Sequence, residues 1–204
     1  MVYLSDLAVG KLLDHVRGAE SGKRTVIVYT ADHGEALNEH GIAGHTFSAF
    51  DNEIRVPMWI DAPPGTLAPE EEASARELKQ SFVFHHDLAP TFLDLLGVWD
   101  DLRLAPFREH MPGRPLIRRE RATGPFLLTN CTWIWESQSA NWGAMNGSLK
   151  VHGRPEWPKF HCHDVLADPL ETKDLGEAAC GDLGAFVRKS FPSTSTAHPV
   201  HPLR

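Results

Sequence analysis

Cysteine, long apolar runs and positive charge are all scarce in this sequence of 204 residues. The three cysteines form no CxxC pair, so neither a disulfide framework nor a structural zinc knuckle is expected, and one isolated disulfide stays open. No segment approaches the roughly 20 apolar residues of a membrane span, and the N-terminus has no apolar signal-peptide core. A formal charge of −7 argues against a nucleic-acid partner, which usually requires a basic surface.

The composition is that of a globular protein, with 42% hydrophobic and 23% charged residues. Such a length suits one ordinary domain, or one domain with a small appendage. Net negative charge does not exclude an anionic substrate, because a bound metal ion can reverse the local field.

The first 118 residues alternate between helical and strand patterns, which is typical of an α/β fold. Thr25–Thr30 is a continuous β-branched run, as expected for a strand buried on both faces of a parallel sheet. Asp87 is placed to begin a helix that Gly97 ends. The pattern predicts a helix over 3–17 and a second helix within 82–96 that begins at Asp87, strands over 25–30 and 56–60, and a solvated loop over 61–75.

After residue 118 the composition changes to short aromatic and β-branched runs separated by Gly, Asn and Ser. This pattern predicts a small antiparallel sheet, followed by a helix over about 178–190. We therefore predict two domains, residues 1–118 and residues 119–204. The runs that predict the sheet cover 125–129, 132–135, 142–145 and 149–152.

Asp32 and His33 directly follow the first predicted strand, where ligand sites gather in open α/β sheets. A turn at Gly34 can direct both side chains at one divalent cation, and His45 can return to the same pocket. A carboxylate with an imidazole suits zinc or manganese, and the carboxylate alone suits calcium. The alternatives are that Asp-His-Gly is ordinary loop sequence and that Glu35 merely begins a short helix.

A second histidine pair lies at 160–164, where strand alternation places His161 and His163 on one face and Cys162 on the other. The pair can bind a stray metal ion, but an exposed edge strand is the interpretation we favour. The tryptophans at 133, 135, 142 and 157 are expected in the core of the small sheet.

Several motifs, in order along the chain, resemble those of the sulfatase/alkaline-phosphatase superfamily. That resemblance implies part of an alkaline-phosphatase-like α/β sandwich, followed by a small C-terminal antiparallel sheet and a helix. The motifs are VIVYTADHGEALNEHGIAGH with its following VP-led strand, DLAPTFLDLLG, PGRPLI, and NGSLKVHG with HDVLADPLETKDLG.

Carried over by position, the resemblance implies that Asp32 and His33 are ligands of a divalent metal ion, either calcium or zinc/manganese. His45 occupies the place of a lysine that contacts the substrate oxyanion in typical sulfatases. Members that act on phosphoryl lipids often have histidine there, which binds phosphate or a second metal. The implied role of His45 is therefore contact with the oxyanion or with a second metal ion.

The sequence departs from the family by lacking the C/S-x-P-x-R motif that carries the nucleophile. We therefore expect a sulfatase-like, metal-dependent hydrolase of sulfate or phosphate esters whose nucleophile half is absent from this chain. Such a chain would be inactive alone and would need the N-terminal half. The alternatives are a non-catalytic remnant and a fragment of a phosphoethanolamine-type transferase. Substrate, metal identity and compartment stay open.

Overall fold

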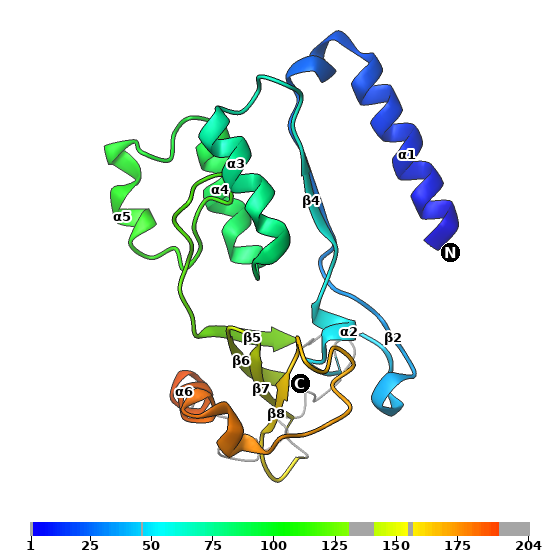
Figure 1. Ribbon diagram of the computed structural model, residues 1–204, viewed down its shortest axis with the longest axis vertical. Helices are drawn as coiled ribbons and strands as arrows, with labels where there is room; N and C mark the ends of the chain where they lie inside the picture. Colours follow the sequence, from blue (N-terminus) through cyan, green and yellow to red (C-terminus); the bar gives the residue numbers. More distant parts are fainter. Residues whose placement is uncertain (1, 46, 131–140, 155–156, 192–204) are drawn as a thin grey trace, which may run out of the picture. The chain divides into compact units, whose positions relative to one another are not determined.

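The computed structural model describes residues 2–45, 47–130, 141–154 and 157–191. Contacts within the chain group its residues into two compact units (Figure 1). Unit 1 comprises residues 1–30 and 58–122, and unit 2 comprises residues 31–57 and 123–204. The division into domains at residue 118 stays a prediction. Among the described residues, none of the helices combines the length and apolarity needed to cross a membrane.

Unit 1 begins with the predicted helix, α1, and Arg17 in its last turn contacts the segment that follows. The Arg17 guanidinium donates to the carbonyls of Gly22 and Thr25, both at 2.8 Å, and pairs with Asp61. Unit 1 contains α1 (Val2–Gly18), η1 (Glu20–Arg24), β1 (Ile27–Thr30), β4 (Met58–Asp61), α3 (Pro69–Glu77), η3 (Leu78–Gln80), η4 (His85–Asp87), α4 (Leu88–Leu95), η5 (Leu102–Leu104) and α5 (Ala105–Arg108).

Strands β1 and β4 form an antiparallel two-stranded ladder in which Thr30 pairs with Met58. Tyr29 and Trp59 are also register partners, and their rings stack with centroids 5.0 Å apart. Both strands were predicted, but the expectation of a β1 buried on both faces of a parallel sheet was wrong. All four β1 residues are half-buried, and every strand pair in the described residues is antiparallel.

The solvated loop predicted over 61–75 was wrong in its second part, because α3 begins at Pro69. Proline at the first helical position and acidic residues in the first turn both favour a helix start. Helix α4 begins after Asp87 as predicted, and Gly97 (φ 71°) follows it. The Asp87 carboxylate accepts from the backbone N–H groups of Phe84 and Arg114, both at 2.9 Å. Asp87 therefore joins two segments instead of capping α4.

Unit 2 is built on an antiparallel four-stranded sheet of order β5-β6-β7-β8 (Figure 1). Three of the four predicted runs form strands, and the fourth, 132–135, lies outside the described residues. Unit 2 contains β2 (Ala36–Leu37), η2 (Glu39–Gly41), β3 (Ala43–Gly44), α2 (Asp51–Ile54), β5 (Phe126–Asn130), β6 (Asn141–Asn146), β7 (Leu149–Gly153), β8 (His161–Asp164), η6 (Glu177–Cys180) and α6 (Leu183–Ser190).

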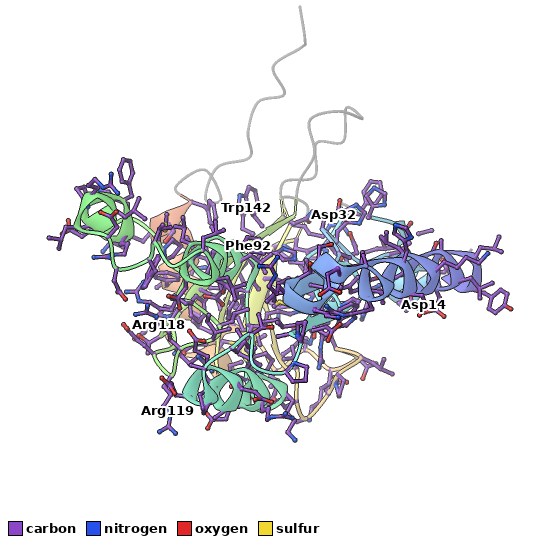
Figure 2. The ribbon with its side chains drawn as sticks, turned by 90° about the horizontal axis from the view of Figure 1, so that it is seen from above. Asp14, Asp32, Phe92, Arg118, Arg119 and Trp142 are labelled. Carbon is purple, nitrogen blue, oxygen red and sulfur yellow. A yellow bond between two sulfur atoms is a disulfide. The ribbon has the colours of Figure 1, made fainter. Side chains whose placement is uncertain are left out.

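One face of this sheet is apolar and packs against α6. Strand alternation places Trp142, Ala144, Val151 and Cys162 on that face, where they form one buried cluster with the inward side of α6. On α6, Leu183 and Val187 are buried, and Phe186 packs against the cluster. Trp142, labelled in Figure 2, is one of the four predicted core tryptophans and lies in this cluster. Trp157 is half-buried and stacks on His161 instead, and positions 133 and 135 lie outside the described residues.

A disulfide joins Cys162 on β8 to Cys180 at the end of η6. The sequence excluded a framework of several disulfides but left this one bond open. The bond lies inside the apolar cluster, because Cys162 is 0% and Cys180 4% exposed. It therefore ties the segment that precedes α6 to the last strand of the sheet.

The opposite face of the sheet is polar, yet it is also covered. Lys150, His152 and His163 lie on this face and are at most 2% exposed. Phe50 packs against both histidine rings, with centroid distances of 4.5 Å to His152 and 5.9 Å to His163. The expectation of an exposed edge strand at 160–164 was therefore wrong: β8 is an edge in the ladder, but residues from 31–57 cover its polar face.

Candidate functional site

The segment after β1 contains a short hairpin that brings distant site residues together. Strands β2 and β3 pair antiparallel, with Ala36 opposite Gly44 and Leu37 opposite Ala43. Asn38 and Gly41 adopt positive φ angles of 88° and 71° in the connecting turn. Both residue types tolerate this left-handed conformation better than most. Because the two strands are in register, the residues that flank the Ala36–Gly44 pair face each other.

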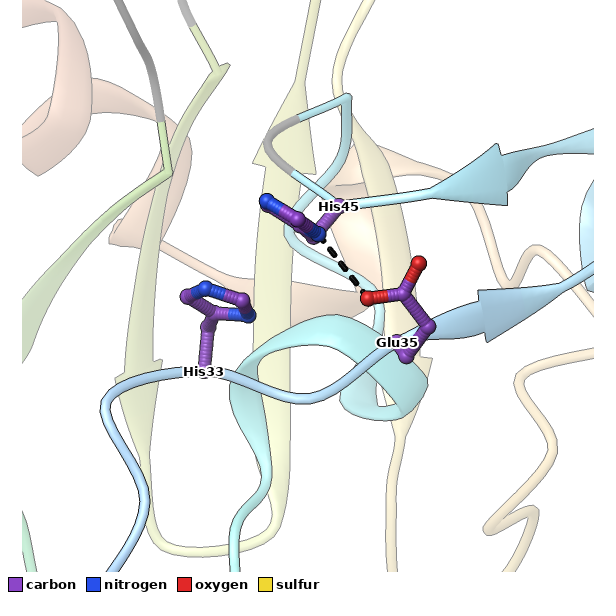
Figure 3. Close-up of side chains that lie close together, drawn as sticks. All are labelled: His33, Glu35 and His45. Atoms are coloured by element: carbon purple, nitrogen blue, oxygen red, sulfur yellow. Dashed lines mark hydrogen bonds and ion pairs between the residues drawn. The ribbon is translucent and has the colours of Figure 1, made fainter. Parts of the chain in front are cut away.

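The hairpin places the imidazoles of His33 and His45 in contact. Their rings stack with centroids 4.1 Å apart and planes inclined by 23° (Figure 3). His33 comes from the turn after β1 and His45 from the end of β3, so the sequence separation of twelve residues is closed by the β2–β3 turn. The predicted approach of His45 to His33 is observed, and the roles of both residues at a metal site stay predictions.

Glu35 completes the cluster, and sequence reasoning had assigned it no role in the site. Its Oε2 lies 2.8 Å from His45 Nδ1, as the dashed line in Figure 3 shows. The alternative that Glu35 merely begins a short helix was wrong, because strand β2 starts at the next residue. A carboxylate on Nδ1 orients the imidazole and leaves Nε2 available for a ligand.

Asp32, labelled in Figure 2, lies next to His33 and has an exposed carboxylate. Its Oδ1 accepts a hydrogen bond of 3.0 Å from the backbone N–H of His33, and its Oδ2 is 3.7 Å from His33 Nε2. The backbone hydrogen bond from His33 is the main reason that the pKa of the Asp32 carboxyl lies below its ordinary value. Asp32 is therefore held as an anion next to the imidazole that was predicted as its fellow ligand. Its role as a metal ligand stays a prediction.

Glu53, on α2, connects the two arms that carry His33 and His45. Its backbone carbonyl accepts from Gly34 N at 2.6 Å. Its carboxylate accepts from Phe47 N at 2.9 Å, from Ser48 N at 3.3 Å and from the Ser48 hydroxyl. Glu53 is fully buried. One residue thus fixes the segments that follow both histidines.

Two glycines make this arrangement possible. An added Cβ on Gly34 would lie 2.2 Å from the carbonyl oxygen of Asn52, so only glycine allows this close approach to α2. Gly44, directly before His45, has a φ of +105°, which side-chain-bearing residues rarely adopt. Both positions set the direction of a histidine.

A buried ion-pair network attaches α2 to the polar face of the sheet. Lys150 Nζ lies 2.6 Å from Asp51 Oδ1 and 2.7 Å from Glu171 Oε1, and Lys150 is fully buried. Glu171 Oε2 accepts from Asp51 N at 2.5 Å. Burial is the main cause that raises the pKa of the Glu171 carboxyl. Local sequence carries no signal for the attachment of Asp51, which lies 99 residues from Lys150 along the chain.

The donor chemistry of the exposed cluster suits a divalent cation. His33, Glu35 and His45 each offer one ligand atom, and these atoms all lie within 4.8 Å of one another. Two imidazole nitrogens and a carboxylate oxygen form a donor set typical of zinc or manganese. The carboxylate of Asp32 adds an oxygen donor at the rim of the cluster.

Comparison with known proteins matches this architecture to one family. The family model "Sulfatase" matches residues 1–98, which include the cluster. N-acetylglucosamine-6-O-sulfatase of Bacteroides thetaiotaomicron is 32% identical over 83% of this chain and 30% of its own length. Choline-sulfatase of Rhizobium meliloti is 26% identical over 95% of this chain and 35% of its own length. The chain belongs to the sulfatase/alkaline-phosphatase superfamily.

Solved structures share the fold of this chain. A protein bound to its substrate D-glucosamine-2-N,6-O-disulfate superposes with a TM-score of 0.60 and 22% identity, over 95% of this chain and 39% of the other. A sulfatase-like protein of Bacteroides thetaiotaomicron gives a TM-score of 0.67 and 18% identity, over 92% and 40%. The predicted alkaline-phosphatase-like α/β fold is thereby confirmed. This sulfatase-family chain spans about a third of the length of these two curated relatives.

Proposed function

We propose that this chain supplies the metal-binding and oxyanion-binding side of an enzyme that hydrolyses sulfate esters. The observation that carries the proposal is the contact between the His33 and His45 imidazoles, with Glu35 bonded to His45. Membership of the sulfatase family supports the ester class. Because the chain spans about a third of its relatives' length, the complete reaction is proposed for an enzyme in which further residues join this site.

In this proposal Asp32 and His33 hold the divalent ion and His45 holds the ester oxyanion. A bound divalent ion supplies Lewis-acid polarisation of the ester group. Asp32 offers an anionic oxygen at the rim of the site, because its pKa is kept low by the backbone N–H of His33. Glu35 fixes the His45 ring through Nδ1, so that Nε2 faces the charge that develops on the transferred group.

A sulfate and a phosphate ester present similar oxyanions, and the same side chains can serve both. The neighbours with sulfatase names favour sulfate. The phosphoethanolamine-type alternative rests on histidine at position 45, where typical sulfatases carry lysine. Direct competition between the two inorganic anions distinguishes these candidates.

The test measures ion and anion binding by the chain itself, with Ca²⁺ and Mn²⁺ titrated calorimetrically. Asp32→Asn and His33→Ala are expected to weaken ion binding at least about tenfold. His45→Ala is expected to spare ion binding but to weaken sulfate binding by the ion-loaded protein. His110→Ala, at an exposed histidine in unit 1, is the matched control. Equal ion affinity in wild type, Asp32→Asn and His33→Ala would refute the proposal.

A further inference from the structure

The polar face of the four-stranded sheet holds two histidines that the proposed active site does not use. His152 is 0% and His163 2% exposed. Within the described residues neither ring nitrogen of His152 has a hydrogen-bond partner, and the ring of His163 has only the backbone of Lys173 beside it. Buried polar side chains are normally hydrogen-bonded, and each exception calls for an explanation such as an unseen ion or water. His152 is such an exception, and the His163 ring lies beside it with centroids 5.3 Å apart, which points to a ligand that the two imidazoles share.

A buried carboxylate lies next to both rings. Glu171 is 3% exposed, and one ligand atom from each of His152, His163 and Glu171 lies within 4.8 Å of the others. Glu171 has a φ of 50°, in the left-handed region that residues with side chains rarely adopt. Its backbone is thus held in an unfavourable conformation that delivers a carboxylate to the histidine face.

We propose that His152, His163 and Glu171 form a second, buried site for a transition-metal cation of the zinc type. Two imidazoles and one carboxylate are the protein ligands of many zinc sites that keep a position open. Cys162 is not a candidate ligand, since it lies on the opposite face and is bonded to Cys180.

The protonation and charge of the cluster agree with a cation. A histidine binds a metal ion in its neutral form, and burial, followed by the charge of Lys150, lowers the pKa of both histidines. Lys150 contributes one positive charge, whereas Asp51 and Glu171 contribute two negative ones. Lys150 Nζ lies 2.7 Å from Glu171 Oε1, so a cation at Glu171 competes with the ammonium. With an ion bound at Glu171, Lys150 still has its ion pair with Asp51.

The position of this site gives it a consequence for the exposed cluster. Phe50 contacts both histidine rings, and the next residue, Asp51, begins α2. Helix α2 also carries Glu53, which fixes the segments after His33 and His45. An ion on the histidine face would therefore stabilise the layer on which the exposed cluster is built.

The experiment uses the full chain carrying His33→Ala and His45→Ala, so that the exposed cluster cannot bind the probe. After treatment with a chelator, this protein is titrated with Co²⁺, followed by its visible absorption, and with Zn²⁺ in equilibrium dialysis. The expected result is one tightly bound ion per chain and a tetrahedral Co²⁺ spectrum. Absence of both the bound ion and the spectrum would overturn the proposal, whatever happens to the function proposed above.

Single variants in the same background then identify the ligands. His163→Gln and His152→Gln are expected to abolish the Co²⁺ spectrum, whereas His161→Gln is the matched control. His161 lies on the same face but stacks on Trp157, with ring centroids 4.1 Å apart, and is not part of the cluster. Circular dichroism verifies that each variant is folded. Equal loss in His161→Gln, or an unchanged spectrum in folded His163→Gln, would overturn the assignment.

Discussion

Replacing Glu53 by alanine should damage the site without touching either histidine. The side chain accepts hydrogen bonds from two backbone N–H groups, at 2.9 and 3.3 Å, and from the Ser48 hydroxyl. A hydrogen bond to a charged group contributes about 1.5–3 kcal/mol, and a buried donor left without its partner costs a comparable amount. Allowing for partial solvation, we expect Glu53→Ala to lower the free energy of unfolding by about 4–6 kcal/mol.

Glu53→Gln separates the hydrogen bonds from the charge. The amide oxygen can accept from both backbone donors, and the amide nitrogen can donate to the Ser48 hydroxyl, so the expected loss is only about 1 kcal/mol. Ser48→Ala removes one hydroxyl and serves as the matched control, with an expected loss of about 1–2 kcal/mol.

Urea unfolding followed by circular dichroism measures the stability of the three variants. Calorimetric titration with Ca²⁺ or Mn²⁺ measures the site, which should weaken most in Glu53→Ala. The reasoning fails if Glu53→Ala lies within about 1 kcal/mol of wild type, or if alanine and glutamine are equally harmful.

Three further outcomes follow from the structure. Replacing Cys162 and Cys180 by serine removes a disulfide that spans a sequence separation of 18, which should lower the free energy of unfolding by about 3 kcal/mol. In urea unfolding, dithiothreitol should destabilise the wild type by a similar amount and leave the variant unchanged. Because burial holds the pKa of His152 well below 6.5, the unfolded chain binds a proton on acidification that the folded chain does not bind. The urea midpoint of unfolding should therefore decrease as the pH is lowered from 7.5 to 5.5. An equally large decrease in His152→Gln would contradict this. Gly34→Ala should destabilise unit 2 because the new Cβ meets the backbone of α2, whereas Gly10→Ala in α1, with nothing within 4 Å, should be neutral or stabilising in thermal unfolding.

The elements with strong local signals were predictable from sequence. Helix α1 follows from its apolar periodicity, and three strands of the small sheet follow from runs bounded by turn residues. Helix α3 was missed although Pro69 and the acidic residues after it are start signals. In that segment the proline- and glycine-rich composition outweighed the helix-start pattern.

The site was predictable only where its residues adjoin a recognisable strand. Asp32, His33 and His45 follow from the strand β1 and the glycine-marked turn. Glu35 was missed because its role depends on the hairpin register, which places it opposite His45. The turn at Asn38 and Gly41 was the available signal, since both residue types tolerate positive φ.

The burial of the histidine face could not be predicted from local sequence. Strand alternation correctly placed His161 and His163 on one face, but the cover on that face comes from Phe50 and Asp51. A partner about a hundred residues away leaves no trace in local periodicity. The same distance hid the pairing of Lys150 with Asp51.

The β1–β4 ladder determines how well the segment between its two strands can tolerate insertions. The chain leaves the ladder after Thr30 and re-enters it at Met58, and these two residues are register partners on the same rung. Residues 31–57 therefore form a long insertion whose two ends are held next to each other by the Thr30–Met58 pair. The entropic cost of lengthening such a segment grows only logarithmically. Insertions at the exposed β2–β3 turn near Asn38 should therefore be tolerated. The hairpin that carries Glu35 and His45 could then vary in length without loss of the β1–β4 pairing.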